Sequence, residues 1–89
     1  MKLKIYEVYD SKAEAYMQPF FMRSRGEALR GWQDACNDTK TQFNKFPEDF
    51  TLFEIGEYDE LTAKIIQPNA HTALGKALEY VKKNQIVDA

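Results

Sequence analysis

Aromatic and basic side chains lie close together in the stretch YMQPFFMRSRGEALRGW, residues 16–32. Single-stranded nucleic acid is bound by aromatic rings that stack on its bases and by Lys and Arg side chains that hold its phosphates. The stretch supplies both kinds of group, since Phe20 and Phe21 lead directly into Arg23 and Arg25. Its composition therefore indicates a nucleic-acid contact.

The same chemistry extends over the first third of the chain. The side chains predicted to hold phosphates are Lys2, Lys4, Lys12, Arg23, Arg25 and Arg30. Those predicted to stack on bases are Tyr6, Tyr16 and either Phe20 or Phe21. An ordinary fold offers another interpretation, in which one phenylalanine belongs to the core, the other contacts a second subunit, and the arginines are solvated.

The charge distribution favours the N-terminal half as the side that meets a polyanion. The 89-residue chain has a net charge of -2, which argues against a protein that coats DNA by charge alone. Residues 1–45 carry eight Lys or Arg and six acids, whereas residues 46–89 carry four and eight. A polyanion should prefer the half with the positive balance.

Acidic side chains gather around two short motifs, PEDF and GEYDE, and consist of Glu48, Asp49, Glu57, Asp59 and Glu60. Clustered carboxylates can hold Mg²⁺, as nucleases require. Their spacing matches no metal-binding loop and no His lies close by in sequence, so a solvated acidic turn is favoured.

Other reactive residues stand alone. Cys36 and His71 are the chain's one cysteine and one histidine, so a Cys/His zinc site and an internal disulfide are not expected. No nucleophile–base pair, glycine-rich phosphate loop or G-K-S/T motif is present. The sequence predicts neither an enzyme nor a bound cofactor or metal.

The N-terminal elements must position the aromatic and basic side chains. KLKIYEVY, residues 2–9, predicts a strand with Leu3 and Ile5 on one side. Lys2, Lys4, Tyr6 and Val8 share its other side. FFMRS, residues 20–24, predicts a second short strand antiparallel to the first.

A helix is predicted to begin at Ser24, because Ser24 and Glu27 form the S-x-x-E pattern of a capping box. Its apolar stripe consists of Ala28, Leu29, Trp32, Ala35 and Cys36. NDTK, residues 37–40, ends it. Trp32 is expected to be a core residue.

The second half predicts a hairpin and another helix. The hairpin strands are Phe50–Glu57 and Leu61–Ile66, with Gly56 as a candidate bulge. HTALGKALEYVKK, residues 71–83, predicts a helix capped by Thr72. The buried stripe of that helix would be Leu74, Ala77, Leu78 and Val81.

The predicted order is β-β-α-β-β-α in a single domain, residues 1–89. This order suggests an α+β fold, a four-stranded, mainly antiparallel sheet with helices on one face. The other face would be open, and we expect it to carry Lys2, Lys4 and Tyr6. An exposed apolar face marks an interaction surface, here for a second subunit or a nucleic acid.

Two blocks, K-I-Y…YDSKAEAY…PFF…R…GEA-R and PEDFTLFE-GE-D, resemble the small nonstructural protein of gokushovirus-type microviruses, phages with circular single-stranded DNA. The resemblance covers residues 1–66. It implies a non-capsid protein made during infection and assigned to the switch to single-strand synthesis and packaging. It supplies no catalytic residues.

The residues and the resemblance together predict a homodimer in the host cytoplasm that binds single-stranded DNA with little sequence preference. No apolar run reaches the ~20 residues of a membrane span, so no membrane partner is expected. The alternative is an adaptor that docks on the phage replication initiator, a host replication protein or the procapsid. In that alternative, the open apolar face and the acidic hairpin make the contacts.

Overall fold

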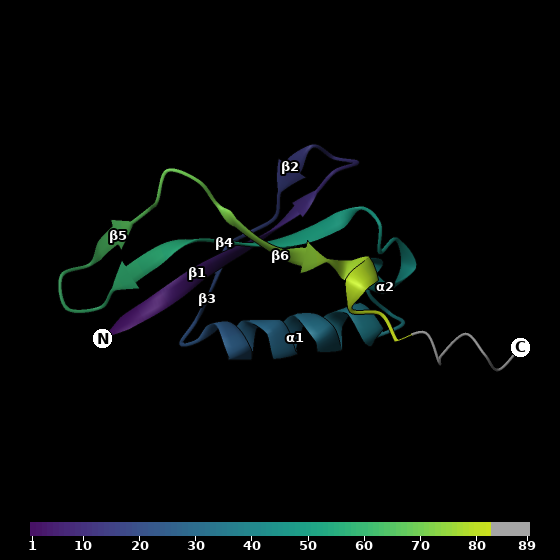
Figure 1. Cartoon of the computed structure of the whole chain (residues 1–89), viewed down its shortest axis with the longest axis horizontal. Helices are drawn as coiled ribbons and strands as arrows, with labels where there is room; N and C mark the ends of the chain where they lie inside the picture. The colour runs from purple at the N-terminus through teal and green to yellow at the C-terminus, as the bar shows by residue number, and fades with distance from the viewer. Residues whose placement is uncertain (83–89) are drawn as a thin grey trace, which may run out of the picture.

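An antiparallel sheet with one long helix across one side forms the centre of the computed structural model, which describes residues 1–82 (Figure 1). The strands are β1 (Lys2–Asp10), β2 (Ala15–Tyr16), β3 (Phe20–Met22), β4 (Phe50–Asp59), β5 (Lys64–Ile66) and β6 (Thr72–Lys76). The helices are α1 (Arg25–Asn37), α2 (Gln42–Lys45) and a 3₁₀ helix, η1 (Ala77–Glu79). The predicted α+β class is confirmed, although α2 was not anticipated.

The sheet has six strands, where four were predicted. β1 pairs with β4, and the outer edge of β1 is shared by β2 and β3. β5 and β6 share the outer edge of β4 in the same way. Pro19 lies between β2 and β3, and Pro68 between β5 and β6. Since proline cannot donate to a ladder, each edge is divided into two short strands.

Gly56 marks a bulge in β4, as the sequence indicated. Tyr6 pairs with Glu54 and Ile5 with Gly56, so Ile55 is the extra residue. A Cβ on Gly56 would lie 2.6 Å from the carbonyl oxygen of Ile66. The absence of a side chain therefore permits β5 to approach β4.

The hairpin turn lies later in the chain than predicted. β4 continues through Tyr58 and Asp59, and the turn occupies residues 60–63 before the short strand β5. The Asp59 carboxylate accepts a hydrogen bond from the Leu61 N–H at 2.9 Å, and Ala63 adopts a φ of 62°. The hydrogen bond from the Leu61 N–H to Asp59 thus fixes the turn at residues 60–63, later than the sequence predicted.

The predicted start of α1 is confirmed. The Ser24 side chain accepts a hydrogen bond from the Glu27 N–H at 3.2 Å. Glu27 in turn accepts from the N–H of Arg23 at 3.3 Å, one residue before the usual partner in a capping box. Two backbone donors at this end of the helix are therefore already occupied.

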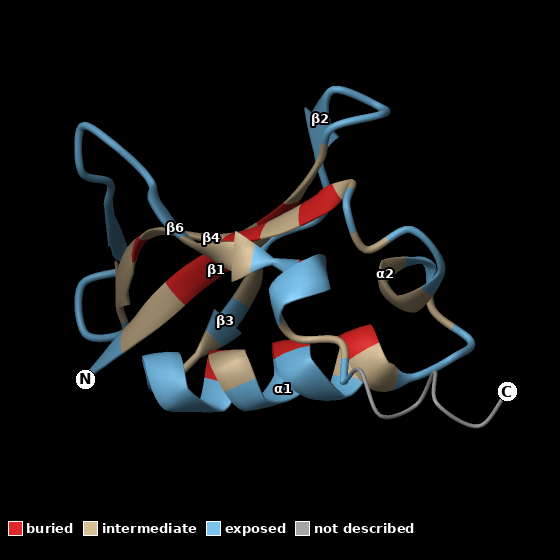
Figure 2. Ribbon diagram, turned by 45° about the vertical axis from the view of Figure 1, so that its right-hand side comes forward, coloured by how far each residue is buried: buried red, intermediate tan, exposed pale blue. Residues whose placement is uncertain are grey.

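The core lies between α1 and the side of the sheet that α1 covers (Figure 2). Its buried residues are Tyr6, Val8, Ala28, Trp32, Cys36, Phe50, Leu52 and Ala77. The expectation that the Lys2, Lys4, Tyr6 and Val8 side of β1 is open is therefore wrong. Tyr6 and Val8 supply the apolar surface that α1 covers, while Lys4 meets carboxylates close to the first turn of the helix.

The helix predicted for residues 71–83 is also wrong, since β6 and η1 occupy its described part. Pairing with β4 holds residues 72–76 extended, and Gly75 adopts a φ of +126° that a helix excludes. The Tyr80 ring lies against Gly75, and its hydroxyl donates to the carbonyl of Leu74 at 2.7 Å. Tertiary pairing thus overrides the helical pattern; Lys83 lies outside the described residues.

Candidate nucleic-acid interface

The side of the sheet away from α1, called here the open face, is not covered by any helix of the described residues, 1–82 (Figures 1 and 2). Strand alternation and register place two groups of aromatic side chains on it. These side chains come from the two central strands, from the short strands at either edge, and from the residue that precedes β6. An open sheet that displays aromatic rings is a surface on which bases can stack.

The first group, called the Tyr16 group, consists of Tyr9, Tyr16, Phe53 and His71. The Tyr16 ring lies 4.9 Å from Tyr9 and 5.9 Å from both Phe53 and His71, measured between ring centroids. Tyr16 is 43% exposed. Tyr9 pairs with Tyr16 on one side and with Thr51 on the other, and Thr51 pairs with Lys76. Since paired residues share a face, Lys76 places a cation on the open face.

The second group, called the Phe21 group, consists of Phe21, Tyr58 and Ile65. The Phe21 and Tyr58 rings meet edge to face with their centroids 5.8 Å apart. Ile65 pairs with Tyr58 across the sheet and is 65% exposed, while Phe21 is 46% exposed. The group presents an apolar surface to solvent at the other end of the open face.

Two of the predicted stacking residues lie on the side that α1 covers. Tyr6 is fully buried and stacks on Phe20 with ring centroids 5.7 Å apart. Burial, followed by the charge of Glu54, raises the pKa of Tyr6 to about 12, and its buried hydroxyl has no hydrogen-bond partner within residues 1–82. In this fold, Tyr6 presents no ring surface to a base.

Two of the side chains predicted to hold phosphates, Lys4 and Arg25, are paired with carboxylates. Glu54 accepts a hydrogen bond from Arg25 Nε at 3.0 Å and lies 3.9 Å from Lys4 Nζ. Glu57 lies 3.2 Å from the same Lys4 ammonium. The hydrogen bond from Arg25 to Glu54 raises the pKa of the guanidinium. A phosphate would have to compete with both acids for Lys4 and Arg25.

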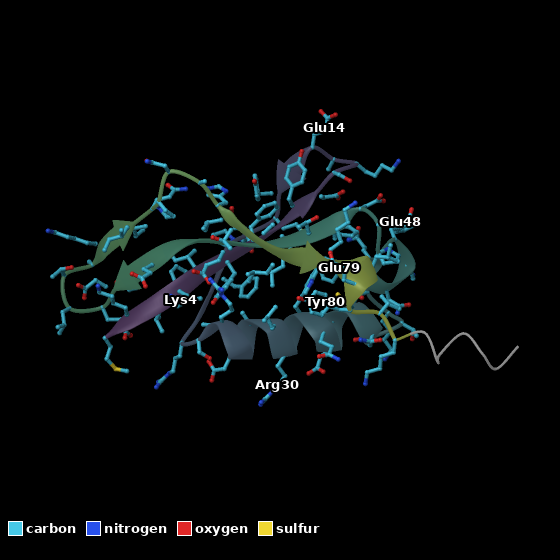
Figure 3. The ribbon with its side chains drawn as sticks, in the orientation of Figure 1. Lys4, Glu14, Arg30, Glu48, Glu79 and Tyr80 are labelled. Carbon is cyan, nitrogen blue, oxygen red and sulfur yellow. The ribbon has the colours of Figure 1, made fainter. Side chains whose placement is uncertain are left out.

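The remaining predicted cations are exposed but scattered. Lys2, Lys12, Arg23 and Arg30 make no ion pair with any residue in the range 1–82. Lys12 lies in the turn between β1 and β2, and Arg23 directly follows β3. Arg30 points outward from the side of α1 opposite the sheet (Figure 3). The structure brings Tyr16 and Phe21 onto one face and leaves Arg30 away from them.

Six residues named here on the open face were not among the predicted site residues: Tyr9, Phe53, Tyr58, Ile65, His71 and Lys76. Alternation along β1 and β4 could have identified Tyr9 and Phe53, because both are out of phase with the buried Val8 and Leu52. Lys76 and His71 could not be found this way, since their segment was predicted to be a helix. Their place follows from the pairing of β6 with β4.

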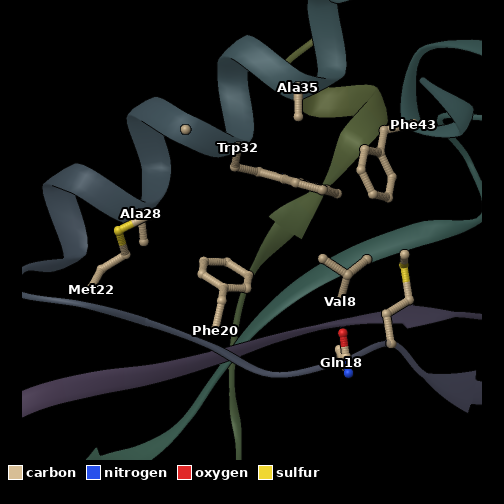
Figure 4. Close-up of a pocket in the computed structure, with 10 residues that line it drawn as sticks. Val8, Gln18, Phe20, Met22, Ala28, Trp32, Ala35 and Phe43 are labelled. Carbon is tan, nitrogen blue, oxygen red and sulfur yellow. The ribbon is translucent and has the colours of Figure 1, made fainter. Parts of the chain in front are cut away.

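A pocket of about 340 Å³ opens between α1 and β3, on the covered side of the sheet (Figure 4). Its lining includes Phe20, Trp32 and Phe43, with Gln18 as the one amide side chain among the lining residues. None of the described residues that line it is charged. The pocket therefore lacks a cation that would hold a phosphate by charge.

Residues 1–82 include neither a clustered set of metal ligands nor a helix that could span a membrane. This part of the chain contains no group of three or more His, Cys, Asp or Glu side chains arranged to hold a metal ion. None of its helices has both the length and the apolar character that a membrane span requires.

Comparison with known families identifies a match over most of the chain. The family model described as "Phage ORF5 protein" matches residues 3–80, which include every strand and helix from β1 to η1 apart from Lys2 at the start of β1. No curated protein matches the chain. No solved structure matches it either.

Proposed function

The chain belongs to the Phage ORF5 protein family, and we propose that it is a nonstructural protein of a microvirus that binds single-stranded DNA with little sequence preference. It acts in the host cytoplasm during viral genome synthesis or packaging. The observation that carries the proposal is the joint exposure of Tyr16 and Phe21 on the open face. Rings placed in this way stack on bases of any sequence, since every base has a π-face.

Charge has a smaller part in this binding than in a basic groove. Lys76 lies on the open face, whereas Lys4 and Arg25 are engaged by acids. Each phosphate contacted on single-stranded DNA contributes a slope of about -0.7 to the dependence of log K on log salt. We therefore expect measurable single-strand binding with a shallow slope, and a preference over duplex DNA, whose bases are already stacked.

Homodimerisation would strengthen this interaction. Two open faces on one assembly convert the second contact into an intramolecular one, which raises avidity without new contacts. A native mass measurement on the purified protein gives the number of subunits directly. A dimer mass is expected, and a monomer mass at the concentrations used for DNA binding would remove dimerisation from the proposal.

Fluorescence anisotropy with labelled oligothymidylate tests the proposal. Replacement of Tyr16 or Phe21 by Ala should weaken binding by roughly 5- to 150-fold for each ring, as expected for the loss of one stacked base. Arg30→Ala is the matched control, because Arg30 points away from the sheet (Figure 3). Equal affinities for all three variants and the wild type, or absence of binding, would contradict the proposal.

The Phe21 group supports a second candidate, an adaptor that docks on the replication initiator, a host replication protein or the procapsid. Ile65 is 65% exposed beside Phe21 and Tyr58, and large exposed apolar patches are typical of protein contacts. Ile65→Ser should then abolish binding of whichever of these purified proteins is the partner. Loss of DNA binding alone would exclude the adaptor.

A further inference from the structure

The Tyr16 group and the Phe21 group are separated along the open face. Tyr16 pairs with Tyr9, and Phe21 pairs with Ile5, so the two groups are attached four residues apart on β1. At a rise of about 3.3 Å per residue, this places them roughly 13 Å apart along the strand. Each group presents rings to solvent at its own end of the face.

An acidic side chain lies between the exposed rings of Tyr16 and Phe21. Glu7 occupies the position on β1 midway between Tyr9 and Ile5, pairs across the sheet with Phe53 of the Tyr16 group, and is half-buried. No Lys or Arg nitrogen within residues 1–82 lies within 4.0 Å of its carboxylate. Its negative charge makes the middle of the open face unfavourable for a phosphate.

We propose that the two aromatic groups are separate stacking stations for one DNA strand, and that the nucleotides between them bridge over Glu7 without stacking on the protein. This inference rests on the proposed single-strand binding and adds to it the length of strand that the face recognises. Once one base is stacked on the Tyr16 group, the strand holds the next bases at a high effective concentration near the Phe21 group.

The separation predicts the length of the recognised strand. Neighbouring nucleotides of one strand in a stacked helix are about 3.4 Å apart along the axis, so 13 Å corresponds to roughly four steps between about five nucleotides, and to fewer if the strand is extended. Shorter strands can reach one station only. Affinity should therefore rise steeply once both stations can be reached and then level off.

The first test is anisotropy competition with unlabelled oligothymidylates of roughly two to eight nucleotides, a range that brackets the predicted span. We expect at least about fivefold tighter binding once the strand reaches both stations, since each stacked base contributes at least that much. A smooth increase of affinity with each added nucleotide would overturn the inference, because it indicates a continuous groove.

The second test replaces single bases of a hexathymidylate by abasic sites. Loss of a base near either end should weaken binding about fivefold or more, whereas loss of a central base should change it less than about twofold. Equal losses at every position would overturn the two-station arrangement while leaving single-strand binding intact. Failure of every oligonucleotide to bind would instead remove the proposed function itself, and the stations with it.

Glu7→Gln gives a matched protein variant, because it removes the charge and keeps the size of the side chain. Binding of hexathymidylate should strengthen by roughly twofold to fivefold, and by more than binding of dithymidylate, which reaches one station and does not cross between them. An equal gain for both lengths would show that Glu7 acts only beside Phe53 in the Tyr16 group, and would overturn its role as a barrier between the stations.

Discussion

Phe20 and Phe21 are neighbours in the chain and lie on opposite faces of the sheet. Phe20 stacks on the buried Tyr6 ring with centroids 5.7 Å apart, whereas Phe21 is 46% exposed and meets Tyr58 on the open face. The alternation of side chains along β3 produces this division. Adjacent aromatic residues thus divide between the packed side of the sheet and its exposed side.

Alanine substitutions should separate these two roles. Phe20→Ala removes a ring packed against the core and should lower the free energy of unfolding by about 2–4 kcal/mol. Phe21→Ala should lower it by less than about 1 kcal/mol, because half of its ring is in water. Urea unfolding followed by circular dichroism measures both, and equal losses would show that the two rings share one environment.

The glycines of α1 and β4 should respond oppositely to alanine. Nothing lies within 4 Å of a Cβ on Gly31, so Gly31→Ala should raise the free energy of unfolding by up to about 1 kcal/mol through helix propensity. A Cβ on Gly56 would lie 2.6 Å from the Ile66 carbonyl oxygen, so Gly56→Ala should destabilise by at least about 1 kcal/mol. Thermal unfolding of the pair tests this; stabilisation by Gly56→Ala would rule out the close approach of β5.

The Cys36 thiol should be inert in the folded protein. Burial raises its pKa to about 12, so at pH 8 the folded protein holds on the order of a thousandfold less thiolate than an exposed cysteine. Reaction with a chromogenic disulfide should therefore be slow in buffer and become fast in urea. Rapid labelling of protein with an intact circular dichroism spectrum would show that the thiol is accessible without unfolding.

Asp59 should contribute to stability at neutral pH and lose this contribution in acid. The Leu61 N–H, followed by the N-terminal ammonium group, lowers the pKa of Asp59 below its ordinary value. A carboxyl with a lowered folded-state pKa stabilises the fold above its unfolded pKa of about 4, and the contribution disappears as pH falls through the folded value. Asp59→Asn keeps an oxygen acceptor for Leu61 and removes the charge.

The difference in unfolding free energy between the wild type and Asp59→Asn should be largest near neutral pH and shrink below about pH 4. Urea unfolding of both proteins across this range measures it. A difference that stays constant with pH would show that the hydrogen bond, and not the carboxylate charge, stabilises the turn.

The sequence correctly predicted the features that depend on residues close together in the chain. Ser24 and Glu27 fix the start of α1, and strand alternation correctly sends Phe20 and Phe21 to opposite faces. Which face is covered could not be read from β1 alone, because both of its sides carry apolar residues. The choice depends on Leu52, which pairs with Val8 and completes the surface that α1 covers.

Long-range pairing accounts for the errors in the second half. The pattern around Leu74 and Ala77 fits a helix, yet residues 72–76 gain hydrogen bonds to β4 that no local pattern reveals. The same pairing brings His71 and Lys76 to the open face. Long-range acidic partners also explain why Arg25 was wrongly predicted to be free for phosphate. Glu54, which binds Arg25, lies 29 positions away in the sequence.

Chemical-shift mapping of the nitrogen-labelled protein with oligothymidylate tests the central claim most directly. The account predicts shift changes at Tyr9, Tyr16, Phe21, Phe53 and Tyr58 on the open face, with the backbone around Arg30 unchanged. Changes concentrated on the outer side of α1 or around the pocket beside Trp32, with the open face silent, would contradict it.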